Sequence, residues 1–207
     1  GATITNLSID TSRNTLEGSD YAGILAGHVV DATIKNCTVS GVVKGKGYVG
    51  GLVGFAESST TQSGDRNTII EDCKADKVAA YTNEAVTFSS EFLNGHSCVG
   101  GIVGFAANTS IIDTYVSTNT GSGNHIYGNG AYVGGVAGAI DHSDIYNTEV
   151  HDGEIGSNNS YAVGGIVGGY CYGHVKVACF SATALIPTST NNYSAAFIGT
   201  RVNNAGF

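Results

Sequence analysis

Hydrophobic and polar positions along the chain follow two short patterns that alternate six times. The first pattern, as in IKNCTV, places an aliphatic residue two positions before an Asn or Asp, with apolar residues following. Its copies begin at Ile4, Ile34, Ile70, Ile111, Ile145 and Val175. The second pattern is glycine-rich: YVGGLVG, CVGGIVG, YVGGVAG and AVGGIVG begin at Tyr48, Cys98, Tyr132 and Ala162, and weaker copies begin at Asp20 and Tyr193. The chain therefore consists of six repeats.

The spacing of the repeats predicts the fold class. The first pattern recurs after 30, 36, 41, 34 and 30 residues, a mean of about 34, and such a period indicates a solenoid, a propeller or an array. Period-2 alternation interrupted by Gly argues against helical repeats. Only Asn94-Gly95 and Asn129-Gly130 are strong hairpin signals, too few for a propeller. We expect an all-β, parallel and right-handed β-helix, a single domain over 1–207 of six coils with repeats starting near 2, 32, 68, 109, 143 and 173.

The first pattern predicts a corner of the coil. In IKNCTV, Ile34 lies on the opposite parity to Cys37 and Val39, so a straight strand would point them to opposite faces. A left-handed conformation at Asn36, which Asn and Asp tolerate, turns all three inward. The corner positions are Asn6, Asn36, Asp72, Asp113 and Asn147, with Val177 departing from the pattern.

Three inward columns follow from this corner. They are Ile4, Ile34, Ile70, Ile111, Ile145 and Val175; Leu7, Cys37, Cys73, Thr114, Thr148 and Ala178; and Ile9, Val39, Ala75, Val116, Val150 and Phe180. Cys37 and Cys73 would lie about 4.8 Å apart on adjacent coils, within range of a disulfide. Stacked free thiols are favoured, and a bond between them stays open.

The glycine-rich pattern predicts close packing. Its paired small residues, such as Gly50-Gly51 and Gly100-Gly101, precede a bulky apolar residue in each copy. Gly within a strand is unfavourable unless another element approaches closely, so we expect an opposing sheet or bulky column to pack on bare backbone here. Tyr48, Tyr132 and Tyr193 share one position, where they could stack along the outside or fill a corner.

Composition and charge restrict the partners. The chain has 31 Gly, one Pro and no Met, and only 13% of its residues are charged. Its net charge is −8 with nine scattered Lys and Arg, which excludes the basic footprint of a nucleic-acid binder. No long apolar run or signal-peptide pattern occurs, so no membrane insertion is expected. The absence of Met suggests a processed or excised chain, and five Cys without a C-x-x-C pair do not fix the compartment.

The segments GLVG at 51–54, GIVG at 101–104 and 165–168, and GVAG at 135–138 resemble the bacterial GLUG-motif repeat. The resemblance spans essentially the whole chain. It implies an extracellular or cell-surface protein, of the kind found in adhesin-like proteins and in non-catalytic regions of IgA-cleaving metallopeptidases. It brings no catalytic residues, and no H-E-x-x-H occurs in the chain.

Motifs that could carry chemistry have simpler interpretations. Residues 45–50 match G-x-G-x-x-G, but a β segment follows where a nucleotide site needs a helix. Asp141, His142 and Asp144, and likewise His151, Asp152 and Glu154, are metal-ligand types in what we interpret as solvated polar turns. Paired acids for glycoside cleavage stay open, although no repeated column offers an acidic pair with a basic partner. We predict no catalytic, cofactor-binding or metal-binding residues, and no cofactor.

Two insertions and one surface patch are candidate recognition features. The third unit carries extra residues at 57–67 and 81–97, and such insertions project from one face of a solenoid, sometimes the binding face. Outward-pointing Ile112, Tyr115 and Tyr146 predict a small patch suited to a sugar or a neighbouring subunit.

The two end coils are the basis of the functional hypothesis. No cap is visible, and the chain contains close to a whole number of turns, which predicts self-association of the end coils, head to tail, into a filament. A segment of a longer surface stalk or adhesin is the competing explanation. We therefore expect a non-enzymatic structural protein, extracellular or on the cell surface. A module binding a carbohydrate or a host surface protein is the alternative, and a polysaccharide-cleaving enzyme ranks third.

Overall fold

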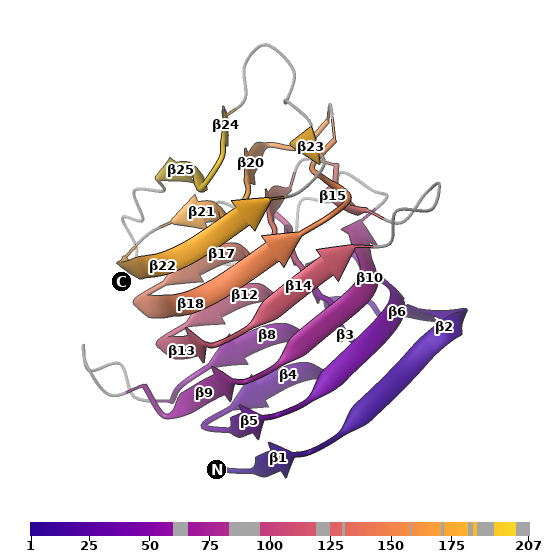
Figure 1. Cartoon of the computed structure of the whole chain (residues 1–207), viewed down its shortest axis with the longest axis vertical. Helices are drawn as coiled ribbons and strands as arrows, with labels where there is room; N and C mark the ends of the chain where they lie inside the picture. Colours follow the sequence, from indigo (N-terminus) through magenta and orange to yellow (C-terminus); the bar gives the residue numbers. More distant parts are fainter. Residues whose placement is uncertain are drawn as a thin grey trace.

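The chain folds as a parallel β-helix of six stacked coils. The computed structural model describes residues 1–59, 66–82, 96–118, 125–129, 131–157, 159–170, 172–181, 184–185 and 193–201. All regular elements in these ranges are β-strands, arranged in one wide sheet and two narrower ones. Each coil crosses the wide sheet, then the second sheet and then the third, and Figure 1 shows the coils rising from the N-terminus to the C-terminal region.

Thirteen of the described strands form the wide sheet. They are β1 (Thr3–Thr5), β2 (Ser8–Glu17), β5 (Thr33–Lys35), β6 (Thr38–Lys44), β9 (Thr68–Glu71), β10 (Lys74–Thr82), β13 (Thr109–Ile112), β14 (Tyr115–Thr118), β15 (Ile126–Gly128), β18 (Ser143–His151), β19 (Glu154–Ile155), β22 (Gly173–Ser181) and β23 (Ala184–Leu185).

The second and third sheets each take one strand from every coil. The second sheet contains β3 (Tyr21–Gly23), β7 (Tyr48–Gly50), β11 (Cys98–Gly100), β16 (Tyr132–Gly134), β20 (Ala162–Gly164) and β24 (Tyr193–Ala195). The third contains β4 (Ala26–Val30), β8 (Val53–Glu57), β12 (Val103–Ala107), β17 (Ala137–Asp141), β21 (Val167–Tyr170) and β25 (Ile198–Arg201). Coils 1 to 6 accordingly begin at β1, β5, β9, β13, β18 and β22.

The register places equivalent residues of successive repeats directly above one another. Every strand pairing is parallel, and Ile34 pairs with Ile4 below and Ile70 above. The column continues through Ile111 and Ile145 to Val175. Its members in coils 2 to 5 are fully buried. The first inward column predicted from the sequence is thereby confirmed.

The predicted corner is also confirmed. The φ angles at its five positions lie in the left-handed region: Asn6 57°, Asn36 52°, Asp72 51°, Asp113 52° and Asn147 48°. Backbone bonds continue through the bend, because the Asn36 amide donates to the Glu71 carbonyl at 3.1 Å. The side chains form a ladder as well, in which the Asn36 amide donates to Asn6 Oδ1 at 2.6 Å. The corner therefore turns the chain without leaving unpaired backbone groups.

The second inward column contains one exposed residue and two cysteines whose state the sequence left open. Leu7 is 41% exposed because it lies on coil 1, which only coil 2 covers. Cys37 and Cys73 are buried and both are free thiols. The Cys73 thiol hydrogen-bonds backbone carbonyls, and burial is the main cause that raises its pKa to about 11. Both thiols are therefore packing residues, and Cys73 stays protonated at neutral pH.

The glycine-rich pattern marks where the second and third sheets meet. One column of the third sheet is Gly in every coil: Gly27, Gly54, Gly104, Gly138, Gly168 and Gly199. A Cβ placed on Gly104 would lie 2.5 Å from the Val49 amide nitrogen of the second sheet. At the predicted Gly pair itself, a Cβ placed on Gly50 would lie 2.8 Å from the Gly104 amide nitrogen of the third sheet, so the expected packing of a sheet on bare backbone is confirmed.

Beside this glycine seam the aromatic residues form a second, smaller core. Tyr48 and Tyr132 are almost fully buried and pack with Phe55, Phe105 and small residues. The Phe55 and Phe105 rings stack 5.4 Å apart, and the Tyr48 ring lies 5.1 Å from Phe105. The Tyr position therefore fills a corner, one of the two arrangements expected from the sequence, while Tyr193 of coil 6 is exposed.

Replacing Gly104 with Ala should destabilise the fold, because the new Cβ would overlap the Val49 backbone, which cannot rotate away. We expect a loss of about 3 kcal/mol in the free energy of unfolding, measured by urea denaturation. Gly27→Ala, in the same column of coil 1, is the matched variant: its nearest atom, the Tyr21 carbonyl oxygen, lies 2.9 Å away, so it should also lose stability, but less. A loss at Gly27 equal to that at Gly104 would contradict this account.

Two Thr→Val substitutions should change stability in opposite directions. Thr148 is fully buried, and its hydroxyl has no hydrogen-bond partner among the described residues, so Thr148→Val should stabilise the fold by about 1 kcal/mol. The Thr109 hydroxyl, equally buried, donates to the Ala107 carbonyl at 3.0 Å. Thr109→Val should therefore destabilise it by about 1 kcal/mol. Thermal and urea unfolding of both variants would show whether the signs differ.

Candidate functional site

Two regions differ from the regular solenoid: the end coils and a polar corner around Asp144. On the end coils, apolar side chains remain uncovered. The large hydrophobic residues that are exposed in the described part of the chain are 38% to 51% exposed, and all but Tyr172 belong to coil 1 or coil 6. They are Leu7, Tyr21 and Val30 on coil 1, and Tyr172, Tyr193 and Phe197 on coil 6 or directly before its first strand.

The end coils also present unpaired strand edges. Among the described strands, β2 pairs only with β6, and β22 only with β18. Each of these two strands therefore directs one row of backbone groups away from the rest of the sheet. A long exposed edge of this kind is a template for pairing with another strand.

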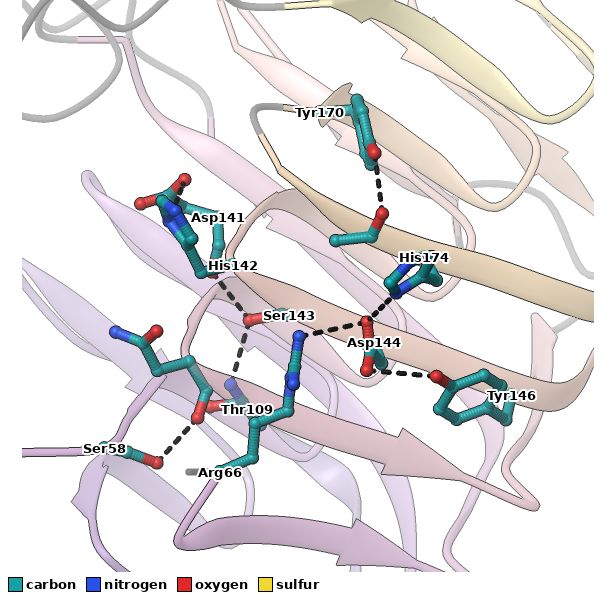
Figure 2. A network of polar contacts seen from close by, with 12 residues as sticks. Ser58, Arg66, Thr109, Asp141, His142, Ser143, Asp144, Tyr146, Tyr170 and His174 are labelled. Carbon is teal, nitrogen blue, oxygen red and sulfur yellow. Dashed lines mark hydrogen bonds and ion pairs between the residues drawn. The ribbon is translucent and has the colours of Figure 1, made fainter. Parts of the chain in front are cut away.

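The polar corner lies where the third sheet meets the wide sheet. Here the chain bends through a second set of left-handed residues, Asp31, Asn108 and His142. Buried hydroxyl groups replace the strand hydrogen bonds at this bend. The Ser143 hydroxyl donates to the Asp141 carbonyl at 2.9 Å and accepts the Thr109 amide at 3.0 Å. This network fixes the start of β18 and so the position of Asp144, the next residue (Figure 2).

Asp144 is the centre of the corner. Its side chain is only 9% exposed, and three groups contact its two oxygens. Arg66 Nη2 lies 3.1 Å and His174 Nδ1 2.9 Å from Oδ1, while the Tyr146 hydroxyl donates to Oδ2 at 3.0 Å. Figure 2 shows Arg66 and His174 reaching Asp144 from different sides. Arg66 therefore ties the end of the first insertion to coil 5, and His174 ties coil 6 to coil 5.

The electrostatics of the corner are set by Asp144. The pKa of the Tyr146 hydroxyl is raised, first by desolvation and then by its hydrogen bond to the Asp144 carboxylate and that group's charge. Nearby, His142 Nδ1 lies 3.0 Å from Oδ1 of the buried Asp141, although not in hydrogen-bonding geometry. The His142 ring stacks on Tyr172 at 4.7 Å. The corner therefore holds two buried carboxylates, each with a histidine beside it.

The structure separates the residues that the sequence placed together. Asp144 contacts Arg66, His174 and Tyr146, whereas Asp141 contacts His142. In the second polar turn, His151 pairs with Glu149, and Glu154 with His125. No group of three or more His, Cys, Asp or Glu among the described residues could hold a metal ion. Sequence reasoning missed Arg66 and His174, because neither lies in a motif shared by the repeats.

The outward patch expected from the sequence is present in part. Ile112, Tyr115 and Tyr146 are all partly exposed. The Tyr115 ring is flanked by Lys74 Nζ at 4.7 Å from its centroid and by the stacked His151 ring at 5.2 Å. Tyr146 and Ile112 lie one above the other in a different column. The patch is therefore two separate aromatic positions.

Other expectations fall partly outside the described residues. The insertions expected at 57–67 and 81–97 are described only at 57–59, 66–67, 81–82 and 96–97. Gly45–Gly50 forms the passage from β6 to β7, with no helix following it in the described range. No helix long and apolar enough to cross a membrane occurs among the described residues.

Comparison with known proteins identifies a structural neighbour. No family model matches the chain, and no curated protein sequence matches it. Two chains of solved structures match, among them the crystal structure of a "putative immunoglobulin A1 protease" from Bacteroides ovatus, with a TM-score of 0.61 and 19% sequence identity. The match covers 97% of this chain and 67% of that chain. At this identity the likeness shows the fold alone, an all-β parallel β-helix.

Replacing Asp144 with Asn should lower the pKa of Tyr146. The substitution removes the negative charge that disfavours the phenolate but leaves the desolvation, so the pKa should fall part of the way to its ordinary value. The measurement is a pH titration of ¹³C-labelled tyrosine rings by NMR. The internal control is Tyr127, whose pKa is raised by burial and by Tyr81. An unchanged Tyr146 titration would contradict the contact.

Proposed function

We propose that this protein is a non-enzymatic structural protein of the bacterial cell surface or extracellular space, of the GLUG-repeat type, whose coils stack head to tail into a filament. The observation that carries the proposal is that five of the six exposed large hydrophobic residues in the described part of the chain lie on coils 1 and 6, and the sixth, Tyr172, directly precedes coil 6. Uncovered apolar side chains on the end coils match association along the solenoid axis.

A second copy is the occupant that fits the end faces best. Placed above coil 6, coil 1 of the next copy would continue several columns with a residue of the same kind. Tyr21 would follow Tyr193, Ala26 would follow Ile198, and Ile4 would follow Val175. The contact already present between Tyr21 and Tyr48, with ring centroids 5.7 Å apart, shows the geometry that such a Tyr pair takes one coil away.

The same placement would satisfy the strand edges. The outer edge of β22 and the outer edge of β2 belong to the same sheet and run parallel. A stacked copy would pair these edges while covering the apolar residues. Because the two faces differ, the contact is heterologous and does not close into a ring by twofold symmetry, so it propagates.

The non-enzymatic part of the proposal is supported by the polar corner. Ser143 is fully buried, and its hydroxyl is occupied by backbone partners, so it is not placed as a nucleophile. The name of the structural neighbour refers to a protease, but at 19% identity that activity does not transfer to this chain. The chain has no H-E-x-x-H sequence.

The test uses two variants that each block one face. Tyr21→Glu places a charge on the coil 1 face, and Tyr193→Glu places one on the coil 6 face. We expect the unaltered chain to form filaments in electron microscopy with an axial repeat of about 29 Å, six coils of about 4.8 Å each. Each variant alone should be a monomer in light scattering. Their equimolar mixture should form a dimer, because each retains the face that the other has lost.

Tyr115→Glu, on the outward face of coil 4, is the control and should leave the filament intact. A monodisperse 21.0 kDa species for the unaltered chain at every concentration tested would overturn the stacking proposal. Filaments that persist in both end-face variants would also overturn it, because association would then use another surface.

A further inference from the structure

The outward face around Tyr146 has the features of a ligand-binding surface, and this role does not depend on end-to-end stacking. We propose that this face binds a neutral saccharide: Ile112 and Tyr146 form the apolar floor, Arg66, His174 and Lys176 supply hydrogen bonds, and the buried Asp144 holds Arg66, His174 and Tyr146 in place. These six residues form the Tyr146 face. They come from the end of the first insertion and from coils 4, 5 and 6.

The floor is an apolar strip one side chain wide. Ile112 and Tyr146 are register partners on β13 and β18, and both are partly exposed. The Tyr146 ring is held in place through its hydroxyl, which donates to Asp144 at 3.0 Å. A fixed aromatic ring next to an aliphatic side chain offers a surface for the C–H face of a pyranose at little cost in side-chain entropy.

Donors and acceptors surround this floor. Lys176 Nζ lies 5.6 Å from the centroid of the Tyr146 ring, and His174 is exposed. Arg66 binds Asp144 through Nη2, while its buried Nε has no partner among the described residues. A few converging polar groups beside an apolar surface are the usual composition of a small-ligand site. Sugar hydroxyl oxygens accept hydrogen bonds, so they suit a set that contains an ammonium and a guanidinium donor.

The charges of the region favour a neutral ligand. Arg66 and Lys176 are cationic, but Asp144 is paired with Arg66, and Asp113 adjoins Ile112 in the chain. An anionic ligand would meet these carboxylates, and a cationic one would meet Arg66 and Lys176. An uncharged polyol avoids both repulsions and can bond to groups of either sign.

The small area of the Tyr146 face favours a saccharide over a protein partner. Specific protein interfaces bury about 800 Å² on each side around an apolar centre. Here the floor consists of two partly exposed side chains, and the neighbouring Tyr115 ring is already flanked by Lys74 and His151. A chain of sugar units lying along the columns would contact successive coils at the spacing of the strands.

The chain offers matched control positions for a binding test. Lys35 occupies the same outward column as Lys176, four coils below, and is paired with Glu71 at 3.0 Å. Tyr115 provides a second outward tyrosine whose ring is flanked by other side chains. Lys176→Gln and Tyr146→Ala therefore have controls in Lys35→Gln and Tyr115→Ala that change the same side chains elsewhere on the wide sheet.

The experiment is isothermal titration of the full chain with four neutral tetrasaccharides, the β-1,4-linked tetramers of glucose, mannose and N-acetylglucosamine and the α-1,4-linked tetramer of glucose. We expect at least one to bind, with affinity about tenfold weaker in Tyr146→Ala and about threefold weaker or more in Lys176→Gln. Both control variants should bind as the unaltered chain does.

Three results would overturn the inference: no binding of any tetramer at millimolar concentration, equal losses in the control variants, or tighter binding of tetragalacturonate than of the neutral tetramers. Circular dichroism of each variant excludes misfolding as the cause of a loss. The Tyr146→Ala variant should still form the filaments proposed above, so a failure of stacking and a failure of saccharide binding are distinguishable.

Discussion

The structure depends on one constraint: in the described strands, a residue lies directly above or below its equivalents in the neighbouring coils, at the spacing of hydrogen-bonded strands. This parallel register runs through all three sheets and is interrupted only at bulges, such as the one between Thr11 and Thr15 of β2. A side chain is therefore selected mainly by the members of its own column. Aliphatic residues and glycines form continuous columns in this way, and in the corner column side-chain bonds join Asn36 to Asn6 and Asn147 to Asp113.

In the outward columns, charged side chains also interact with members of their own column. Lys35 lies 3.0 Å from Glu71 of the next coil, and Lys44 lies 3.6 Å from Glu17 of the previous one. Stacked like charges would repel at strand spacing, whereas alternating charges attract. These pairs are exposed, and each contributes little to stability by itself. Their effect is on register, because a shift of one residue would separate every pair at once.

The sequence was sufficient to predict the features that all coils share. The parity change around Asn36 predicts a left-handed corner, and the repeated GG predicts close packing of backbone. The second corner could not be found in this way, because its left-handed residues Asp31, Asn108 and His142 belong to no common motif. For the aromatic core, the sequence predicted the shared Tyr position but not its Phe partners. Tyr48 packs with Phe55, seven residues later in the chain, and alternation alone does not predict such a contact.

The Tyr146 face illustrates why a site is harder to predict than a coil. The column of Asp144 reads Thr3, Thr33, Ile69, Ser110, Asp144 and His174. It has no common residue type, so no column rule explains a buried carboxylate there. Asp144 is tolerated because Arg66 of the first insertion and His174 of the coil above both reach it, and a buried charge without such partners would be costly. In a solenoid, a column that departs from its own pattern while keeping its polar groups satisfied is therefore the place to look for function.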